Sequence, residues 1–170
     1  MAVSVDVAPA AQCGMAFEQP PRARDTILYG GLTVGLLDAC DATLFFGALG
    51  ASPERIARHV ASGLLGPSSF DGGTAPIVLG VLLHFTVAIC IATVFYLCAR
   101  ALPVLVRHPV RGGLGFGVVA YFVMTWIVVP LSRAPHGTPR LLVLINGIVG
   151  HALLVGLPIA LWAARSTRRR

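Results

Sequence analysis

The chain has 170 residues, of which 56% are apolar and 12% carry a formal charge. Soluble domains carry about 25% charged residues, so this chain has too little polar surface to cover a water-soluble globular fold. The net charge of +6 is compatible with a nucleic-acid partner, but the basic residues, all of them arginine, lie beside apolar segments instead of along one shared face. We therefore expect a membrane protein whose partner is the lipid bilayer and which binds no nucleic acid.

The chain begins with a segment that predicts no regular structure. Residues 1–24 are rich in Ala, Pro and Gln and have no apolar period, which predicts a disordered cytoplasmic tail. A first membrane span is expected at residues 27–50, because a helix of about 20 apolar residues crosses the hydrocarbon layer. A signal peptide is the alternative, since Arg22 and Arg24 precede this segment, but the segment is too long for one and contains two acidic residues.

A short amphipathic helix is predicted within residues 51–66. Ser52 suits the N-cap and Pro53 the first helical position. Ile56, Val60 and Leu64 recur every four residues between arginine and histidine side chains. This pattern is typical of a helix that lies in the membrane interface or caps a bundle.

Three further apolar segments predict the remaining spans, at residues 75–98, 113–131 and 141–163. With the first span they predict an all-α fold, a four-helix transmembrane bundle formed by one domain over residues 25–164. A short interfacial helix separates spans one and two in this fold. Residues 165–170 are expected to form a basic cytoplasmic tail.

Two pairs of glycines predict where the spans pack against each other. Gly31 and Gly35 lie four residues apart on the first span, and Gly113 and Gly117 do so on the third. This spacing of small residues lets two helices approach closely in lipid. We expect both pairs to lie at helix contacts of a compact bundle.

Arginine is unevenly distributed between the two sides of this bundle. The two tails and the middle loop carry nine arginines, whereas the other two loops carry four. Cytoplasmic segments carry an excess of basic residues, so both termini are expected in the cytoplasm and the amphipathic helix on the periplasmic or extracellular side. The sequence leaves open whether the chain forms a homo-oligomer.

Four ionisable side chains interrupt the spans, and together with Asn146 they form a candidate site: Asp38, Asp41, His84 and His151. An ionisable group inside a membrane is costly unless it finds a partner. At a rise of about 1.5 Å per residue, the two acids and two imidazoles lie within roughly one helical turn of the same depth. Because Asp38 and Asp41 share a helix face, we expect them to meet the two histidines inside the bundle, with Asn146 extending the network toward the outer face.

Three interpretations of this cluster remain open. Hydrogen bonds between the acids and the histidines could hold the bundle in register. Alternatively, the four ionisable groups could relay a proton or a cation. The two histidines could also ligate a haem, or join the acids in a metal site. No flanking motif supports ligation, and the four cysteines form no CxxC pair, so no cofactor and no metal are predicted.

Motifs of soluble enzymes are absent from the sequence. It contains no P-loop, no G-x-S-x-G and no H-E-x-x-H. The leading hypothesis is therefore a non-enzymatic membrane component with a buried Asp/His cluster. A small proton-coupled or cation-handling transporter is the alternative.

Four motifs carry a resemblance to a known family: Ser52–Arg55 through Ala61–Gly66, Gly72–Gly73, Leu82–Phe85 and Val129–Ser132. Over about residues 27–163 the chain resembles small four-span bacterial inner-membrane proteins of unknown function. It is distantly similar to the YagU-like inner-membrane proteins, which likewise place a histidine in a span. The resemblance implies a location in the bacterial inner membrane, and it implies no activity or site residue.

Overall fold

The computed structural model describes residues 20–168, of which 84% are helical, with no strand among them. Four of its helical segments are long and apolar enough to span a membrane: Arg24–Ala48, Ala75–Ala101, Pro109–Leu131 and Leu141–Thr167. Only 17–22% of the most apolar stretch of each segment is buried inside the protein, so the rest of this apolar surface requires lipid. The chain is therefore a multi-pass membrane protein with the predicted all-α, four-span fold.

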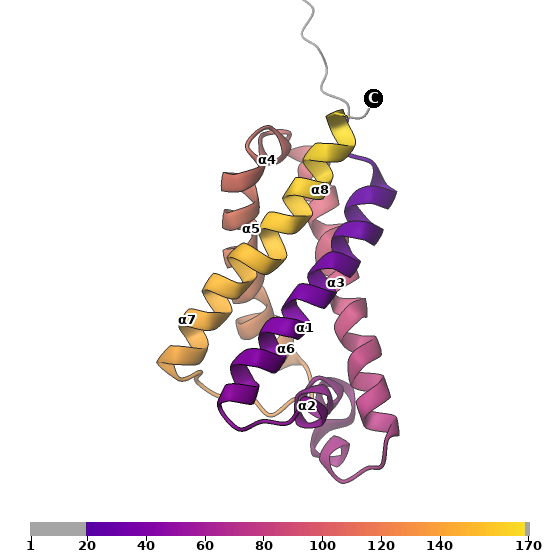
Figure 1. Cartoon of the computed structure of the whole chain (residues 1–170), viewed down its shortest axis with the longest axis vertical. Helices are drawn as coiled ribbons and strands as arrows, with labels where there is room; N and C mark the ends of the chain where they lie inside the picture. The colour runs from indigo at the N-terminus through magenta and orange to yellow at the C-terminus, as the bar shows by residue number, and fades with distance from the viewer. Residues whose placement is uncertain (1–19, 169–170) are drawn as a thin grey trace, which may run out of the picture.

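The spans alternate in direction, so that the described parts of both chain ends lie together at the top of Figure 1. We call this the terminal end of the bundle and the opposite one the loop end. Residues 1–19 and 169–170 of the two predicted tails lie outside the described residues, whereas residues 165–168 continue the last helix. The helices and helical turns, in chain order, are η1 (Arg24–Gly30), α1 (Gly31–Ala48), α2 (Pro53–Leu65), η2 (Gly66–Phe70), α3 (Ala75–Ala101), α4 (Val104–Arg107), α5 (Pro109–Val123), η3 (Met124–Val128), α6 (Val129–Leu131), α7 (Leu141–Gly150), η4 (His151–Gly156) and α8 (Leu157–Arg168).

Two spans contain a widened helical turn just before a proline. In η3 the Val129 N–H bonds to the Met124 carbonyl, and in η4 the Leu157 N–H bonds to the Ala152 carbonyl, each five residues back. Pro130 and Pro158 follow these turns. A proline lacks the N–H and crowds the carbonyl four residues before it, so the helix widens locally instead of continuing its regular ladder.

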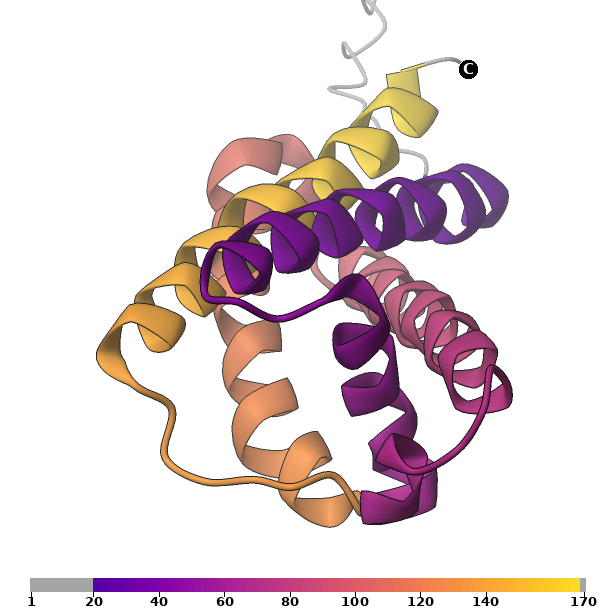
Figure 2. The ribbon, with the colours of Figure 1, turned by 60° about the horizontal axis from the view of Figure 1, so that its bottom comes forward.

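Helix α2 caps the loop end, which is one of the two positions predicted for it. Its N-cap is as expected, since the Ser52 hydroxyl accepts a hydrogen bond from the Arg55 N–H at 3.2 Å. On one side the Ala57 carbonyl lies directly against Gly80 of α3, where no side chain would fit. On the other side the Gly63 carbonyl accepts a hydrogen bond from the Arg133 N–H at 3.0 Å, just after α6. Figure 2 shows α2 between α3 and the end of the third span.

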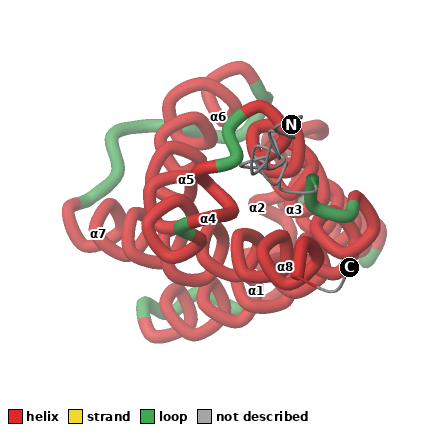
Figure 3. Tube along the Cα trace, turned by 90° about the horizontal axis from the view of Figure 1, so that it is seen from above, coloured by secondary structure: helices red, strands yellow, loops and turns green. Residues whose placement is uncertain are grey.

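The core of the bundle lies toward the terminal end. There α8 packs against both η1 and α5 (Figure 3), and Phe95 of α3 meets Phe116 of α5 edge-to-face at 5.0 Å between ring centroids. The fully buried apolar side chains include those of Phe95, Ile159 and Ala163. Small side chains on α8 thus let three spans converge around one phenyl ring.

Both predicted glycine pairs are confirmed as helix contacts. A Cβ atom on Gly31 would lie 3.0 Å from the Cα of Ile89 on α3, and Gly35 packs under the Phe85 ring of the same helix. On the third span, Gly113 faces the backbone of Gly156, and Gly117 faces that of His151. The absence of side chains at these positions is what allows the spans to approach each other.

Candidate functional site

The centre of the candidate site is the pair formed by Asp38 on α1 and His84 on α3. The Nδ1 atom of His84 lies 4.0 Å from a carboxylate oxygen of Asp38, and the two side chains are 19% and 30% exposed. The other ring nitrogen, Nε2, lies 2.7 Å from the Gly35 carbonyl of α1. Because Gly35 has no side chain, the imidazole reaches this carbonyl directly.

The Gly35 contact fixes where the ring carries its proton. A carbonyl oxygen can only accept a hydrogen bond, so Nε2 must be the protonated nitrogen. Nδ1 is then the position at which the ring gains or loses a second proton, and it faces the Asp38 carboxylate. The pair therefore offers two proton acceptors that face each other, the Nδ1 atom of His84 and the Asp38 carboxylate.

Asp41 belongs to a different interaction. Its carboxylate accepts a hydrogen bond from the side-chain amide of Asn146 on α7 at 3.0 Å, and it lies against Gly150, where a Cβ atom would be 3.2 Å from the carboxylate oxygen. This bond connects the first span to the fourth. Asn146, which is predicted to extend the cluster, has Asp41 as its hydrogen-bond partner.

His151 lies beside these two pairs and is bonded to neither carboxylate by any hydrogen bond among the described residues. Its ring packs edge-on against Tyr121 of α5, with 5.3 Å between centroids. It interacts electrostatically with Asp38 and Asp41, and with the Gly147 carbonyl one turn earlier on its own helix. The expected single Asp/His cluster is thus divided into an Asp38–His84 pair, an Asp41–Asn146 bond and a flanking imidazole.

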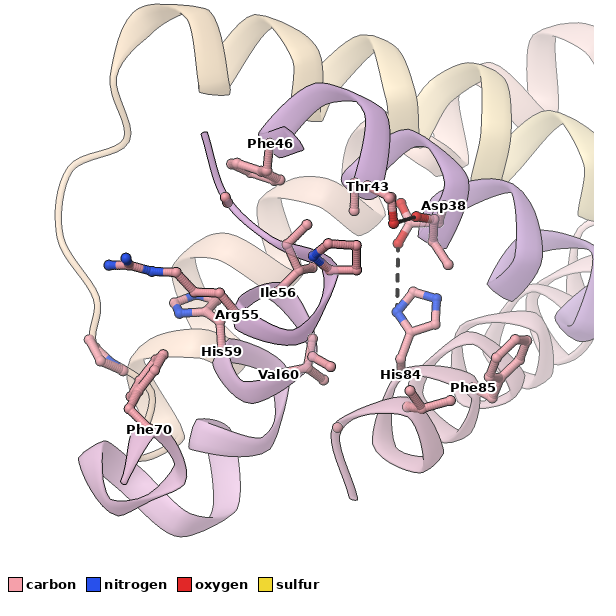
Figure 4. A pocket seen from close by; sticks show the side chains of 18 residues that line it. Asp38, Thr43, Phe46, Arg55, Ile56, His59, Val60, Phe70, His84 and Phe85 are labelled. Carbon is pink, nitrogen blue, oxygen red and sulfur yellow. Dashed lines mark hydrogen bonds and ion pairs between the residues drawn. The ribbon is translucent and has the colours of Figure 1, made fainter. Parts of the chain in front are cut away.

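A cleft of about 800 Å³ opens beside the Asp38–His84 pair, between α1, α2 and α3 (Figure 4). Asp38 and His84 lie at its inner end, toward the middle of the spans, while Arg55, His59 and Phe70 lie nearer its mouth at the loop end. The walls between them are largely apolar. Their lining residues include Ala39, Ala42, Phe46, Ile56, Val60 and Val81.

The cleft ends where the packed core begins. One helical turn beyond the pair toward the terminal end, Val34 on α1 is 1% exposed and Ala88 on α3 is 5% exposed. Both belong to the buried apolar core that includes Phe95 and Ile159. The Asp38–His84 pair is therefore open to the loop end and separated from the terminal end by close-packed side chains.

The mouth of the cleft is held by Arg58, which the sequence places only on the polar face of the amphipathic helix. Its guanidinium donates hydrogen bonds to the carbonyls of Ser69 at 2.9 Å, Gly72 at 2.7 Å and Gly73 at 2.9 Å. These bonds fix the connection between α2 and α3, which carries Phe70. Backbone carbonyls have no signature in the sequence, so neither this clamp nor the cleft could be predicted.

The arrangement gives little support to ligation of a metal or haem. Within residues 20–168, no group of three or more His, Cys, Asp or Glu side chains is placed to hold a metal ion. The Nε2 atom of His84 is engaged with Gly35, and His151 is not among the residues that line the cleft. Of the two imidazoles, therefore, only His84 lines the cleft.

Comparison of the chain with known protein families, characterised proteins and solved structures finds no match. Its function therefore has to be argued from the site itself.

Proposed function

We propose that the chain is a small proton-coupled or cation-handling transporter of the bacterial inner membrane, with both termini in the cytoplasm. The excess of arginine on the tails and the middle loop, nine against four, supports this orientation. With it, the terminal end of the bundle faces the cytoplasm and the cleft opens to the periplasm.

The observation that carries the proposal is the Asp38–His84 pair at the inner end of a cleft that is open on one side. A histidine titrates close to physiological pH, and ionisable side chains within membrane spans commonly mark pathways for protons or ions. The free Nδ1 and the carboxylate, 4.0 Å apart, offer a position where a proton arriving through the cleft can bind. A carrier needs such a site that is reached from one side at a time.

The competing hypothesis, a purely structural cluster, fits Asp41 and Asn146 better than it fits Asp38 and His84. The Asp41–Asn146 hydrogen bond has an ordinary length of 3.0 Å and joins two spans, as interhelical polar contacts in membranes do. By contrast, 4.0 Å is too long for a hydrogen bond between Asp38 and His84. We assign the structural role to the first pair and the proton-binding role to the second.

Nitrogen NMR of ¹⁵N-histidine-labelled protein in nanodiscs tests the assignment. We expect the His84 ring to carry its proton on Nε2 and to bind a second proton at Nδ1. Because interacting groups titrate together, Asp38→Asn should change the shape of this titration, whereas Asp41→Asn, three residues along the same helix, should leave it unchanged. The proposal fails if His84 does not titrate in the wild-type protein, or if both variants behave alike.

Transport itself is tested with purified protein in liposomes that contain a pH-sensitive dye. An imposed pH gradient should dissipate faster with the wild-type protein and with Asp41→Asn than in empty liposomes when a transported cation is supplied. Asp38→Asn should match empty liposomes. Equal rates for the two variants would refute the role of Asp38.

A further inference from the structure

The cleft beside Asp38 is far larger than a proton requires. Its volume of about 800 Å³ lies within the range of about 300–1,000 Å³ that is usual for small-molecule sites. Phe46 of α1 and Ile56 and Val60 of α2 line its walls, and Phe70 lies at its mouth (Figure 4). The cleft therefore has the size and the apolar walls to accept an organic molecule.

The inner end of the cleft provides one carboxylate with free acceptor positions. Asp38 is 30% exposed, and its nearest charged or titratable partner is the His84 ring at 4.0 Å. No hydrogen-bond donor among residues 20–168 is bonded to it. Asp41, the other acid at this depth, is already bonded to Asn146 and does not line the cleft.

The other titratable groups near Asp38 leave the inner end of the cleft negative. His84 faces Asp38 from α3 and His151 interacts with it from η4, but His84 carries no charge until Nδ1 is protonated. At the mouth, more than a third of His59 is exposed, and partial desolvation of its ring lowers its pKa, which favours the neutral imidazole. Arg55 extends away from Asp38 (Figure 4).

We propose that this cleft binds a lipophilic organic cation, with its charged group on Asp38 and its apolar body between α1 and α2. A carboxylate attracts the charge, and the apolar side chains of Phe46, Ile56 and Val60 line the part of the cleft that would hold the body of the molecule. Where the Asp38–His84 pair has bound a proton, the cation takes its place, so that at most one proton leaves through the cleft for each monovalent cation that binds. This inference rests on the proposed proton-binding role of the pair and adds the class of molecule that exchanges with the proton.

Binding of tetraphenylphosphonium to the purified full-length protein in nanodiscs tests the inference. Isothermal titration calorimetry in two buffers of different ionisation enthalpy reports both binding and the number of protons released, which we expect to rise as the pH is lowered and to stay at or below one. We expect saturable binding to the wild-type protein and to Asp41→Asn, and at least a tenfold weaker affinity for Asp38→Asn. Empty nanodiscs correct for partition of the probe into lipid.

Tetraphenylborate, an anion of the same shape, is the matched control probe. It should show no saturable binding beyond that of empty nanodiscs. Saturable binding of the anion that is lost in Arg55→Ala would overturn the inference in favour of an anionic amphiphile. Equal affinity of the cation for Asp38→Asn and Asp41→Asn, or no binding at all, would also overturn it. If the cation fails to bind but Asp38→Asn still changes the titration of His84, the proton-binding role survives and only the cation site is wrong.

Discussion

The terminal and loop halves of the bundle are built from similarly apolar spans but pack in different ways. In the terminal half, glycines and alanines bring α3, α5 and α8 together around Phe95, which is fully buried. In the loop half, α2 lies between α3 and the third span, and a cleft of about 800 Å³ remains beside it. The polar pair lies at the boundary between these halves. Tight packing on one side and an open cleft on the other give the pair access from one end only.

The largest effect is expected at Gly117, where α5 and η4 meet backbone to backbone. A Cβ atom there would lie 2.7 Å from the Cα of Ala152 and would also meet the His151 carbonyl. Overpacking commonly costs about 1–3 kcal/mol and more where the backbone cannot move, so Gly117→Val should lower the free energy of unfolding by about 3 kcal/mol or more. Thermal unfolding in detergent measures the loss.

Gly115→Val, two residues away on the same helix, is the matched control. A Cβ atom at Gly115 meets nothing within 4 Å, so this variant should stay within about 0.5 kcal/mol of the wild type. Equal destabilisation by the two valines would mean that the contact between α5 and η4 does not close the terminal half.

An intermediate effect is expected in the open half, at Arg58. Arg58→Ala removes three hydrogen bonds to the carbonyls of Ser69, Gly72 and Gly73. Hydrogen bonds to charged groups contribute about 1.5–3 kcal/mol, and because these are partly exposed we expect a loss of about 1.5 kcal/mol. Limited proteolysis should then cut the connection between α2 and α3 several-fold faster than in the wild type. The Arg55→Ala variant is the control: the Arg55 side chain makes no such bonds, so this variant should be cut at the wild-type rate. If the Arg58→Ala variant is also cut at the wild-type rate, the connection between α2 and α3 is held by other contacts.

The smallest effect is expected from the Asp41–Asn146 bond. Interhelical polar contacts in membranes contribute about 0.6 kcal/mol on average, so Asn146→Ala should destabilise the protein by about that amount. The titration of His84, followed by nitrogen NMR, should stay unchanged, because Asn146 bonds only to Asp41 within the described part of the chain. A change in that titration would show that the Asp41–Asn146 bond and the Asp38–His84 pair form one coupled network.

Features set by local sequence could be predicted, and features set by contacts between helices could not. The four spans follow from apolar runs, and the start of α2 follows from Ser52 and Pro53. The first helix nevertheless begins at Arg24 instead of Ile27, and the last continues to Arg168. Apolarity locates the membrane segment of a helix and not its ends, since arginines continue a helix beyond the hydrocarbon layer.

At the candidate site, too, the contacts between helices could not be predicted from the sequence. Equal depth on the spans predicts that Asp38 lies close to His84, and the two side chains are 4.0 Å apart in the structure. Depth alone could not show that Asp41 turns to Asn146, nor that His151 packs on Tyr121, because both depend on how each span is rotated about its axis. Rotation is decided by close contacts such as that of Gly147 with the Tyr121 ring. These contacts involve residues far apart in the sequence, and single-residue patterns do not reveal them.

The most direct test of the central claim is the accessibility of the cleft from each side of the membrane. In protein whose native cysteines are replaced by alanine, Ala42→Cys places a thiol in the cleft and Val34→Cys places one in the packed core. Ser68→Cys marks the loop end and Thr167→Cys marks the terminal end. We predict that a membrane-impermeant maleimide labels Ala42→Cys only from the side that labels Ser68→Cys, and Val34→Cys from neither side. Labelling of Ala42→Cys from the side of Thr167→Cys would contradict one-sided access to Asp38 and His84.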